Sequence, residues 1–301
     1  MKKRIIWIIV AASFFIGCIV YASSFYNEVS TTLETIHEPE IRQVSKLRTT
    51  EVELVKKQPF SLLLLGVDER ENDKGRSDTI IVITANPSTN STKIISIPRD
   101  TYTEIIGKNK VDKINHAYAF GGMDMALHSV ENLLNIPIDY VVQVNMESFL
   151  EIVDIVGGVT VENANAFQVD DFIFDEGTIH LDGEQALSYV RMRMDDPLGD
   201  FGRQARQKQV LQAVLQKGAS INSLWNYKDI LSSLQKNLRT NMTFEQMIDI
   251  QKGYKSTLNQ MESLSFEKGE GKKIDGIWYF MMDEEELKNV TTKLKEHLEI
   301  E

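Results

Sequence analysis

Arginine is concentrated in one stretch of the chain, between Tyr189 and Gln207. Arg191 and Arg193 are two residues apart, so an extended backbone would project both side chains to the same side, whereas Arg203 and Gln207 are four apart, on one face of a helix. The planar guanidinium donates hydrogen bonds in a fork that suits phosphate oxygens, so several arginines in one pocket predict a ligand with more than one negative charge. The alternative is that some of them pair with nearby carboxylates, namely Asp195, Asp196 and Asp200.

Two aspartates come earlier in the chain: Asp68 follows one apolar run, and Asp78 opens the next. Loops at the ends of buried strands are where open α/β sheets place ligands. Two carboxylates there suit a hard cation such as Mg²⁺, which prefers oxygen ligands. A turn capped by Asp78 and an ion pair of Asp68 with Arg70 or Arg76 explain the spacing equally well, and the residues alone leave both interpretations open.

A further polar group, Pro98-Arg99-Asp100, follows another apolar run, and Lys113-Ile114-Asn115 comes shortly after it. An isolated arginine in such a position is more often part of a surface ion pair than a ligand contact. The place of Arg99 at a strand end, beside the first group, favours the ligand contact.

The elements that must position these side chains alternate between strands and helices. Short runs of leucine or β-branched residues predict buried strands at 61–67, 79–84 and 93–97, with an extended segment at 138–144. Helices are predicted at 123–134, 148–156, 183–189, 201–217, 243–254 and 283–297. Thr243 and Gln246 match a capping box, and the pairs Gly121-Gly122 and Gly157-Gly158 match turns or helix ends. This alternation predicts one layered α/β domain.

The N-terminus has a different character. Met1-Lys2-Lys3-Arg4 is followed by an apolar stretch from Ile5 to Tyr26, which is long enough for a membrane-spanning helix of roughly 20 residues. The basic residues before it predict a cytoplasmic N-terminus and an extracellular remainder. A cleaved signal peptide is the alternative, but the apolar core is long for one and Ala22-Ser23-Ser24 is a weak cleavage site. We predict a cytoplasmic tail at 1–4, a transmembrane signal anchor at 5–26, a stalk or linker at 27–58 and an extracellular domain at 59–301.

Composition excludes several classes of protein. All 44 acidic residues and 30 of the 33 basic ones follow the predicted span, which leaves the outer part with a net charge of −14 and disfavours nucleic-acid binding. Cys18 is the only cysteine, so the chain forms neither an internal disulfide nor a cysteine-based zinc site. The sequence contains no P-loop, G-x-S-x-G or H-E-x-x-H motif, and its five histidines are scattered.

Eight strings between Leu62 and Leu211, half of the chain, resemble in order and spacing the LytR-CpsA-Psr family of Gram-positive cell-wall enzymes. They are LLLLGVDER, GRSDTIIVITANP, ISIPRD, KINHAYAFGG, VENLLNIPIDYVVQVN, IVGGVTV, LDGEQALSYVRMR and GDFGRQARQ. A single string such as PRD is weak evidence, but eight in sequence are specific. The resemblance implies a three-layer α/β/α domain with a central mixed sheet, which moves a glycopolymer of teichoic acid or capsule type from a polyprenyl-pyrophosphate carrier to a peptidoglycan hydroxyl.

The resemblance also implies roles for single residues. Asp68 and Asp78 correspond to carboxylates associated with Mg²⁺, and either one is a candidate for accepting the proton of the incoming hydroxyl. The residues implied to grip the pyrophosphate are Arg99, Arg191, Arg193, Arg203 and Gln207, with Arg76 and Lys113 in matching motifs. Asp68, Asp78, Arg99 and Arg191 are thereby predicted as the catalytic set. Some members have a further basic residue just after PRD, where this chain has Tyr102 and Thr103.

The predicted partners are the lipid-linked glycopolymer, peptidoglycan and the bilayer that holds the N-terminal helix. A non-catalytic sensor or scaffold that binds polyprenyl phosphates through the same basic pocket is the alternative function. A long prenyl tail needs an apolar groove, but the sequence does not separate residues that line a groove from those of an ordinary core.

Overall fold

The computed structural model describes residues 36–39, 41–42, 44–68, 75–193, 196–220 and 238–300. The transmembrane helix predicted at 5–26, with Cys18, lies outside these residues. Within them, no helix combines the length and the apolar composition that crossing a bilayer requires.

A mixed six-stranded sheet forms the centre of the molecule, with the strand order β11-β6-β1-β2-β3-β12. The neighbours β1–β6 and β3–β12 are parallel, and the other adjacent strands are antiparallel. The strands are β1 (Phe60–Val67), β2 (Ser77–Asn86), β3 (Ser91–Ser96), β6 (Tyr140–Asn145), β11 (Leu238–Thr240) and β12 (Gln260–Leu264). The three predicted strands and the predicted extended segment are thus confirmed, whereas the two edge strands, β11 and β12, were not predicted.

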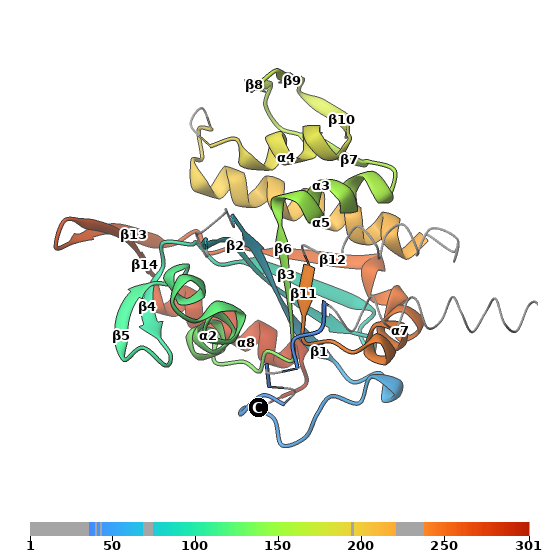
Figure 1. Cartoon of the computed structure of the whole chain (residues 1–301), viewed down its shortest axis with the longest axis vertical. Helices are drawn as coiled ribbons and strands as arrows, with labels where there is room; N and C mark the ends of the chain where they lie inside the picture. The colour runs from blue at the N-terminus through green and yellow to red at the C-terminus, as the bar shows by residue number, and fades with distance from the viewer. Residues whose placement is uncertain are drawn as a thin grey trace, which may run out of the picture.

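Helices pack against both faces of this sheet. Side chains alternate across β1, so the strand contributes to two cores. Leu63 and Leu65 pack on one face with residues of α2 (His116–Leu134) and α8 (Glu284–His297). Leu62 and Leu64 pack on the other face with α5 (Asp200–Ser220). Figure 1 shows α2 and α8 below the sheet and α5 above it. The predicted α/β class with a central mixed sheet is confirmed.

The remaining helices match the sequence prediction within a few residues. They are α3 (Met146–Ile155), α4 (Gly183–Arg191) and α7 (Phe244–Gly253). Two short 3₁₀ helices, η1 (Leu54–Lys56) and η3 (Lys255–Asn259), were not predicted. The capping box is present: Gln246 N–H donates to Thr243 Oγ1, and Thr243 N–H donates to Gln246 Oε1. Helix α2 begins earlier than predicted and is kinked at Gly121-Gly122, where φ of Gly122 is 65°, a conformation that favours glycine.

Outside the central sheet, the described residues form four two-stranded sheets, and none of them was predicted from the sequence. They pair β4 (Tyr102–Ile105) with β5 (Lys110–Lys113), β7 (Val159–Asn163) with β10 (Gly177–Leu181), β8 (Phe167–Val169) with β9 (Phe172–Phe174), and β13 (Gly269–Ile274) with β14 (Ile277–Met282). Hairpins β4–β5 and β13–β14 lie together at one end of the molecule (Figure 1).

The described residues of the predicted stalk or linker include a section that is bound to the sheet. Arg48 forms an ion pair with the buried carboxylate of Asp139 (Nε to Oδ1, 2.5 Å) and donates to the carbonyl of Pro59 (3.1 Å). The same carboxylate accepts the backbone N–H of Ser61 at the start of β1 (2.9 Å). This part of the segment therefore approaches the domain in a fixed position.

Candidate active site

The antiparallel pairing of β2 and β3 brings the start of one strand beside the end of the other. Ile97 N–H donates to the carbonyl of Ile80 (2.8 Å), and the chain then turns at Pro98. Asp78, near the start of β2, thereby meets Arg99, just past β3: Arg99 Nη1 lies 2.6 Å from Asp78 Oδ2. Two motifs far apart in sequence form one edge of a site, as their positions at strand ends predicted.

The start of α2 closes a second side of this site. Asn115 Nδ2 donates to Asp78 Oδ1 (3.1 Å), and its backbone N–H donates to the carbonyl of Arg99 (3.2 Å). Lys113, at the end of β5, forms an ion pair with Asp100 (Nζ to Oδ1, 2.7 Å). The Pro98-Arg99-Asp100 turn is thus held from two directions.

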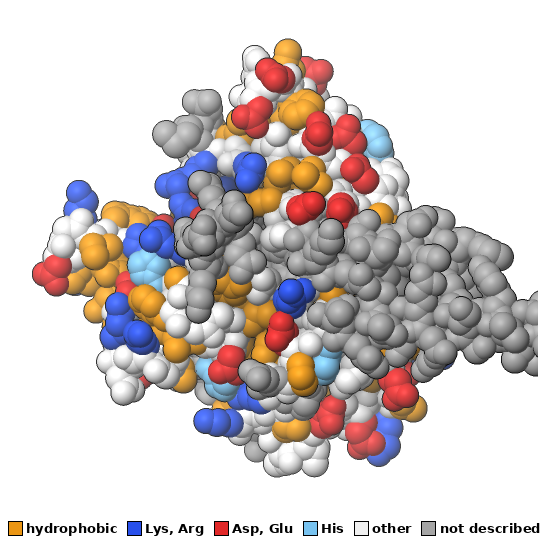
Figure 2. All heavy atoms as spheres, viewed as in Figure 1, with side chains coloured by type: hydrophobic (Ala, Val, Ile, Leu, Met, Phe, Trp, Pro, Cys, Tyr) orange, Lys and Arg blue, Asp and Glu red, His pale blue; other side chains and the backbone are white. Residues whose placement is uncertain are grey.

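These groups line a polar pocket of about 350 Å³. Its walls come from Arg76, Asp78, Arg99, Asp100, Lys113, Asn115, Arg193 and Trp278. Four cations and two carboxylates give this polar pocket a net charge of +2 in a protein of net charge −11. Figure 2 shows Lys and Arg side chains gathered between hairpin β13–β14 and the upper part of the molecule, which carries scattered Asp and Glu side chains. The site is therefore electrostatically suited to an anion.

The four cations differ in how they are engaged. Arg99 and Lys113 are held by Asp78 and Asp100. Arg76 and Arg193 have exposed side chains, and neither forms an ion pair with any other residue that the structure describes. A ligand with two anionic groups would meet two cations held by carboxylates and two without an ion pair among the described residues.

A neighbouring carboxylate, Asp112 on β5, is saturated and does not compete for these cations. Its burial acts to raise the pKa, but hydrogen bonds from Lys110, from the Lys113 backbone and from His116 outweigh it and lower the pKa to about 2. Lys110 Nζ lies 2.6 Å and His116 Nδ1 3.0 Å from this carboxylate. Asp112 therefore stays ionised and leaves Lys113 to the polar pocket.

Arg203 and Gln207 lie on one face of α5, as predicted, and that face contacts β2. Arg203 Nη2 donates to the carbonyl of Asp78 (3.3 Å), and Gln207 Nε2 donates to Thr79 Oγ1 (2.9 Å). Arg203 also pairs with Asp200 (2.8 Å), one of the carboxylates weighed as an alternative partner. Neither Arg203 nor Gln207 lines the polar pocket; both position α5 over the strand that carries Asp78.

Arg191 and Arg193 do not share the extended backbone that would project both side chains to the same side. Helix α4 continues to Arg191, whose side chain is exposed and outside the lining of the polar pocket, whereas Arg193 follows the helix and lines that pocket. Arg206, to which the sequence analysis assigned no role, holds the end of α4 in place beside α5. It donates to the carbonyls of Tyr189 (3.0 Å) and Met192 (2.5 Å) and pairs with Asp196 (2.5 Å).

Asp68 and Asp78, the predicted metal pair, are in different positions. Asp78 lines the polar pocket, whereas Asp68 lies just past β1, where its N–H donates to the carbonyl of Arg76 (3.4 Å), and is not part of the lining. The second carboxylate of the lining is Asp100. Over the described ranges, no three His, Cys, Asp or Glu side chains are grouped so that they could hold a metal ion.

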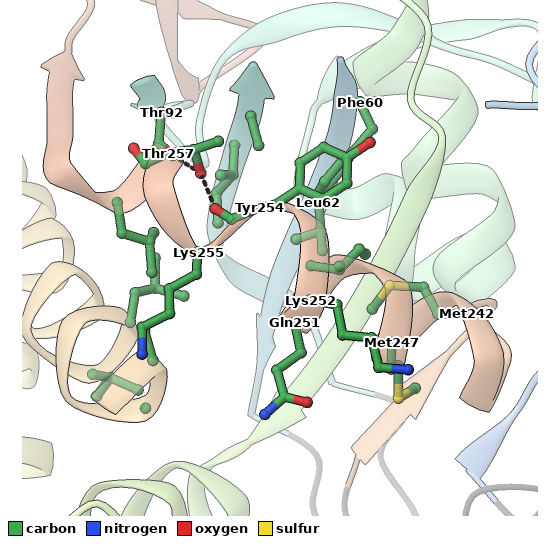
Figure 3. Close-up of a pocket in the computed structure, with 18 of the residues that line it drawn as sticks. Phe60, Leu62, Thr92, Met242, Met247, Gln251, Lys252, Tyr254, Lys255 and Thr257 are labelled. Atoms are coloured by element: carbon green, nitrogen blue, oxygen red, sulfur yellow. Dashed lines mark hydrogen bonds between the residues drawn. The ribbon is translucent and has the colours of Figure 1, made fainter. Parts of the chain in front are cut away.

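A second cavity, of about 700 Å³, lies on the α5 face of the sheet. Most of its lining is apolar: Leu62, Ile83, Ile152, Val214, Leu215 and Ile250 come from β1, β2, α3, α5 and α7. Figure 3 shows Met242, Met247 and Tyr254 around this apolar cavity, with Lys252 and Lys255 beside them. Sequence patterns did not identify the residues that line this cavity, because the same residue types fill an ordinary core.

Helix α5 connects the two sites. Arg203 and Gln207 contact the strand that carries Asp78, whereas Val214, Leu215 and Gly218 line the apolar cavity. Fifteen residues separate Arg203 from Gly218, which corresponds to about 22 Å along a helix. One rigid element therefore spans a basic site and an apolar one.

Comparison with known proteins identifies the family of this chain. The model of the LytR_cpsA_psr family matches residues 21–296. A Bacillus cereus protein named polyisoprenyl-teichoic acid–peptidoglycan teichoic acid transferase TagU is 52% identical over 302 residues, which cover 100% of this chain and 99% of that protein. The crystal structure of B. subtilis TagU superposes with a TM-score of 0.67 at 48% identity, covering 81% of this chain and 99% of that one.

A further solved structure, TagT bound to LIIa-WTA, has a TM-score of 0.73 and 32% identity and covers 85% of this chain and 97% of its own. The family predicted from eight short strings is confirmed over nearly the whole sequence. This chain belongs to the LytR_cpsA_psr family.

Proposed function

We propose that this protein is a membrane-anchored phosphotransferase that moves a glycopolymer of teichoic acid or capsule type from a polyprenyl-pyrophosphate carrier to a peptidoglycan hydroxyl. The observation that carries the proposal is α5, which contacts the strand that carries Asp78 of the polar pocket at one end and lines the apolar cavity at the other. A lipid-linked polymer has the matching composition, since a doubly charged head group is joined to a long hydrocarbon chain. The name of the B. cereus relative supports the same reaction.

In this proposal, the pyrophosphate binds in the polar pocket and the prenyl tail in the apolar cavity. Arg76, Arg99, Lys113 and Arg193 neutralise the phosphate oxygens, the main requirement of phosphoryl transfer. Arg203 and Gln207 act by holding α5 on β2. Arg191 is exposed and is not part of the polar-pocket lining, so its predicted contact with the pyrophosphate remains a proposal.

The transfer exchanges one phosphorus–oxygen bond for another. The acceptor hydroxyl oxygen bonds to the phosphorus that carries the polymer, and the bond from that phosphorus to the bridging oxygen of the carrier breaks. Polyprenyl monophosphate leaves, and the polymer is joined to peptidoglycan through a phosphodiester. The hydroxyl proton passes to a carboxylate, for which Asp78 in the polar pocket is the first candidate and Asp68 the second, and then to solvent.

Mg²⁺ is the proposed cofactor. This ion commonly uses one or two carboxylates and completes its coordination with substrate phosphates and water. Asp78 fits that role, because a carboxylate has about four acceptor positions and Arg99 and Asn115 use two. The family resemblance makes Asp68 the proposed second ligand, although its side chain is not part of the polar-pocket lining. When bound, the ion would stabilise charge on the phosphoryl oxygens.

The proposed location is the cell membrane, with residues 5–26 as a single-pass anchor and the domain outside. A lipid substrate is confined to the bilayer, so tethering the domain there raises the effective concentration of each for the other. The fixed contact of Arg48 with Asp139 supports an anchor segment that approaches the domain in a defined position.

The experiment uses the full-length chain in phospholipid nanodiscs with Mg²⁺, lipid-linked polymer and peptidoglycan. We expect a polymer–peptidoglycan phosphodiester and an equal amount of polyprenyl monophosphate, measured by mass spectrometry. Asp78→Asn, which keeps the size of the side chain, should reduce product formation at least about 100-fold at unchanged melting temperature. A folded protein that binds the lipid but forms no product would instead support the sensor or scaffold function.

A further inference from the structure

Hairpin β13–β14 brings an aromatic ring into the wall of the polar pocket. Trp278 lines that pocket and is 44% exposed. The phosphate contacts of the proposed function do not need it, because phosphate has no apolar surface to pack on an indole. The prenyl tail does not need it either, since the apolar cavity lies at the other end of α5.

The hairpin is hydrogen-bonded to the Pro98-Arg99-Asp100 turn, so the indole has a defined position. Phe280 N–H donates to the carbonyl of Asp100 (2.9 Å). On the opposite face, the Tyr279 ring meets Tyr102 edge to face, with centroids 5.0 Å apart. Trp278 is two residues from Phe280, or about 7 Å along a strand. The position of Trp278 is therefore fixed relative to Asp100, a carboxylate of the polar pocket.

Glycines on β13 allow the indole to lie across the hairpin. Phe280 pairs with Gly271, and Trp278 pairs with Lys273, so these four residues share one face. A Cβ atom at Gly271 would lie 2.7 Å from Nε1 of Trp278, which shows how closely the ring approaches the β13 backbone. The result is a flat, partly exposed aromatic surface beside charged hydrogen-bonding groups.

A pyranose ring matches both parts of this surface. Its C–H bonds present an apolar face that packs on an indole, and its hydroxyls hydrogen-bond to groups such as Asp100 and Lys113. Aromatic walls with a few polar groups that set orientation are the usual composition of small-molecule sites. Trp278 is therefore suited to bind a sugar close to the reacting phosphate.

We propose that Trp278 is the stacking platform for a sugar of the acceptor glycan, an inference that rests on the proposed function. In phosphoryl transfer the attacking and leaving oxygens are roughly in line with phosphorus. The leaving oxygen belongs to the carrier, whose tail is proposed to enter the apolar cavity beside α7. Hairpin β13–β14 and α7 lie on opposite sides of the molecule (Figure 1). The incoming hydroxyl then approaches from the Trp278 side.

The kinetic test uses the full-length chain in nanodiscs, lipid-linked polymer as donor and soluble GlcNAc–MurNAc oligosaccharides as acceptor. Trp278→Ala should raise the acceptor KM at least tenfold and change the donor KM less than twofold, at unchanged melting temperature. Trp278→Phe, which keeps an aromatic face, should restore the acceptor KM to within threefold of the original. The matched control is Ile277→Ala, which truncates an exposed neighbour.

Four results would overturn the proposal. In Trp278→Ala, the acceptor KM could stay unchanged, or the donor KM could rise equally, which would assign the ring to a sugar of the donor. Trp278→Phe could fail to restore the acceptor KM, or Ile277→Ala could raise the acceptor KM as much as Trp278→Ala does. A binding measurement separates this from failure of the proposed function. With Trp7 and Trp225 replaced by phenylalanine, the remaining tryptophan fluorescence should change on titration with the oligosaccharide. A fluorescence change without any transfer would contradict the proposed function but support the sugar site. Transfer without a fluorescence change would contradict the sugar site.

Discussion

The two ends of α5 differ in the kind of surface that they meet. At the N-terminal end, Arg203 and Gln207 reach polar groups of β2 beside a pocket of net positive charge. At the C-terminal end, Val214 and Leu215 face a larger cavity with an apolar lining. Polar ligands are held by a few directed contacts, whereas burial of a hydrocarbon depends on area. Single substitutions should therefore be severe at the first end and graded at the second.

The largest effect is expected at the polar end, from Arg99→Ala. It removes a cation from the polar pocket and leaves Asp78 without its ion-pair partner (2.6 Å). Loss of a charged donor to developing phosphate charge should lower kcat by about 100- to 1,000-fold. Transfer kinetics with saturating donor check this expectation.

The matched control for Arg99→Ala is Arg239→Ala, which truncates a half-exposed arginine of β11 that pairs with Glu38. It should leave kcat within twofold. A loss below tenfold in Arg99→Ala, with a folded protein, would contradict the severe sensitivity assigned to the polar end.

The two ends of α5 also differ in what the sequence reveals. Asp78, Arg99, Lys113 and Arg193 were identified because Asp78 and Arg99 lie at the ends of predicted strands, because arginines stand out in a strongly acidic chain, and because the motifs that contain all four match the family in order. The β2–β3 pairing, which was not predicted, brings Asp78 and Arg99 together. The apolar cavity was not predictable, since Leu62 and Ile83 look like any core residue until the packing leaves space between them.

Other features depended on chain geometry that short patterns do not encode. Trp278 reaches the polar pocket through a hairpin that begins more than seventy residues after Arg193. Arg191 was misplaced because α4 extends two residues beyond the predicted end, and that difference changes which side chain faces the polar pocket. Helix interiors and buried strands were predicted well, since local periodicity determines them; hairpins and helix ends were not.

Stability should depend on a third region, the polar cluster around His297 at the far end of β2 and β3. His297 is 5% exposed and contacts Thr84 (2.7 Å) and Ser91 (2.9 Å). Burial, aided by the charge of Lys93, lowers its pKa from 6.5 to about 4. Above pH 6.5 both the folded and unfolded states are neutral at this residue. As pH falls from about 6.5 to about 4, the unfolded chain takes up a proton that the folded chain excludes.

The free energy of unfolding should therefore fall by up to about 3 kcal/mol over that window because of His297. Denaturant unfolding at several pH values measures it, and His297→Gln should flatten the dependence. If the original protein and the variant lose stability in parallel, the neutral, buried state of His297 is not its cause. This effect is on folding, which distinguishes the region from both ends of α5.

At the C-terminal end of α5, substrate binding should weaken when a larger side chain fills part of the apolar cavity. Gly218 lines the apolar cavity, and a Cβ placed there would meet nothing within 4 Å. Gly218→Trp should fill part of the space and raise the KM for a long-chain donor about tenfold, which corresponds to about 1.4 kcal/mol. The rise should shrink for a donor with a short prenyl chain, which needs less of the apolar cavity.

Gly218→Ala controls for the backbone effect of replacing glycine in a helix, about 1 kcal/mol in favour of folding. It should raise the donor KM less than Gly218→Trp does. An equal rise for long and short chains would mean that the substitution acts through the polar end or through the fold, and the separation of head-group and tail sites along α5 would fail.

The smallest effect is expected where α7 begins, just outside the apolar cavity. Thr243 accepts the N–H of Gln246 through its hydroxyl (3.3 Å), and α7 contributes Met247 and Ile250 to the cavity wall. Thr243→Ala removes one helix cap and should cost about 1 kcal/mol of stability. The packing of Met247 and Ile250 against the sheet should hold α7 in place, so the donor KM should change less than twofold. Thermal unfolding and donor kinetics on the same preparation check both parts. A tenfold rise in the donor KM would show that the Thr243 cap, rather than packing, holds α7 in the wall of the apolar cavity. Binding at the C-terminal end of α5 would then depend on a directed contact, as it does at the polar pocket.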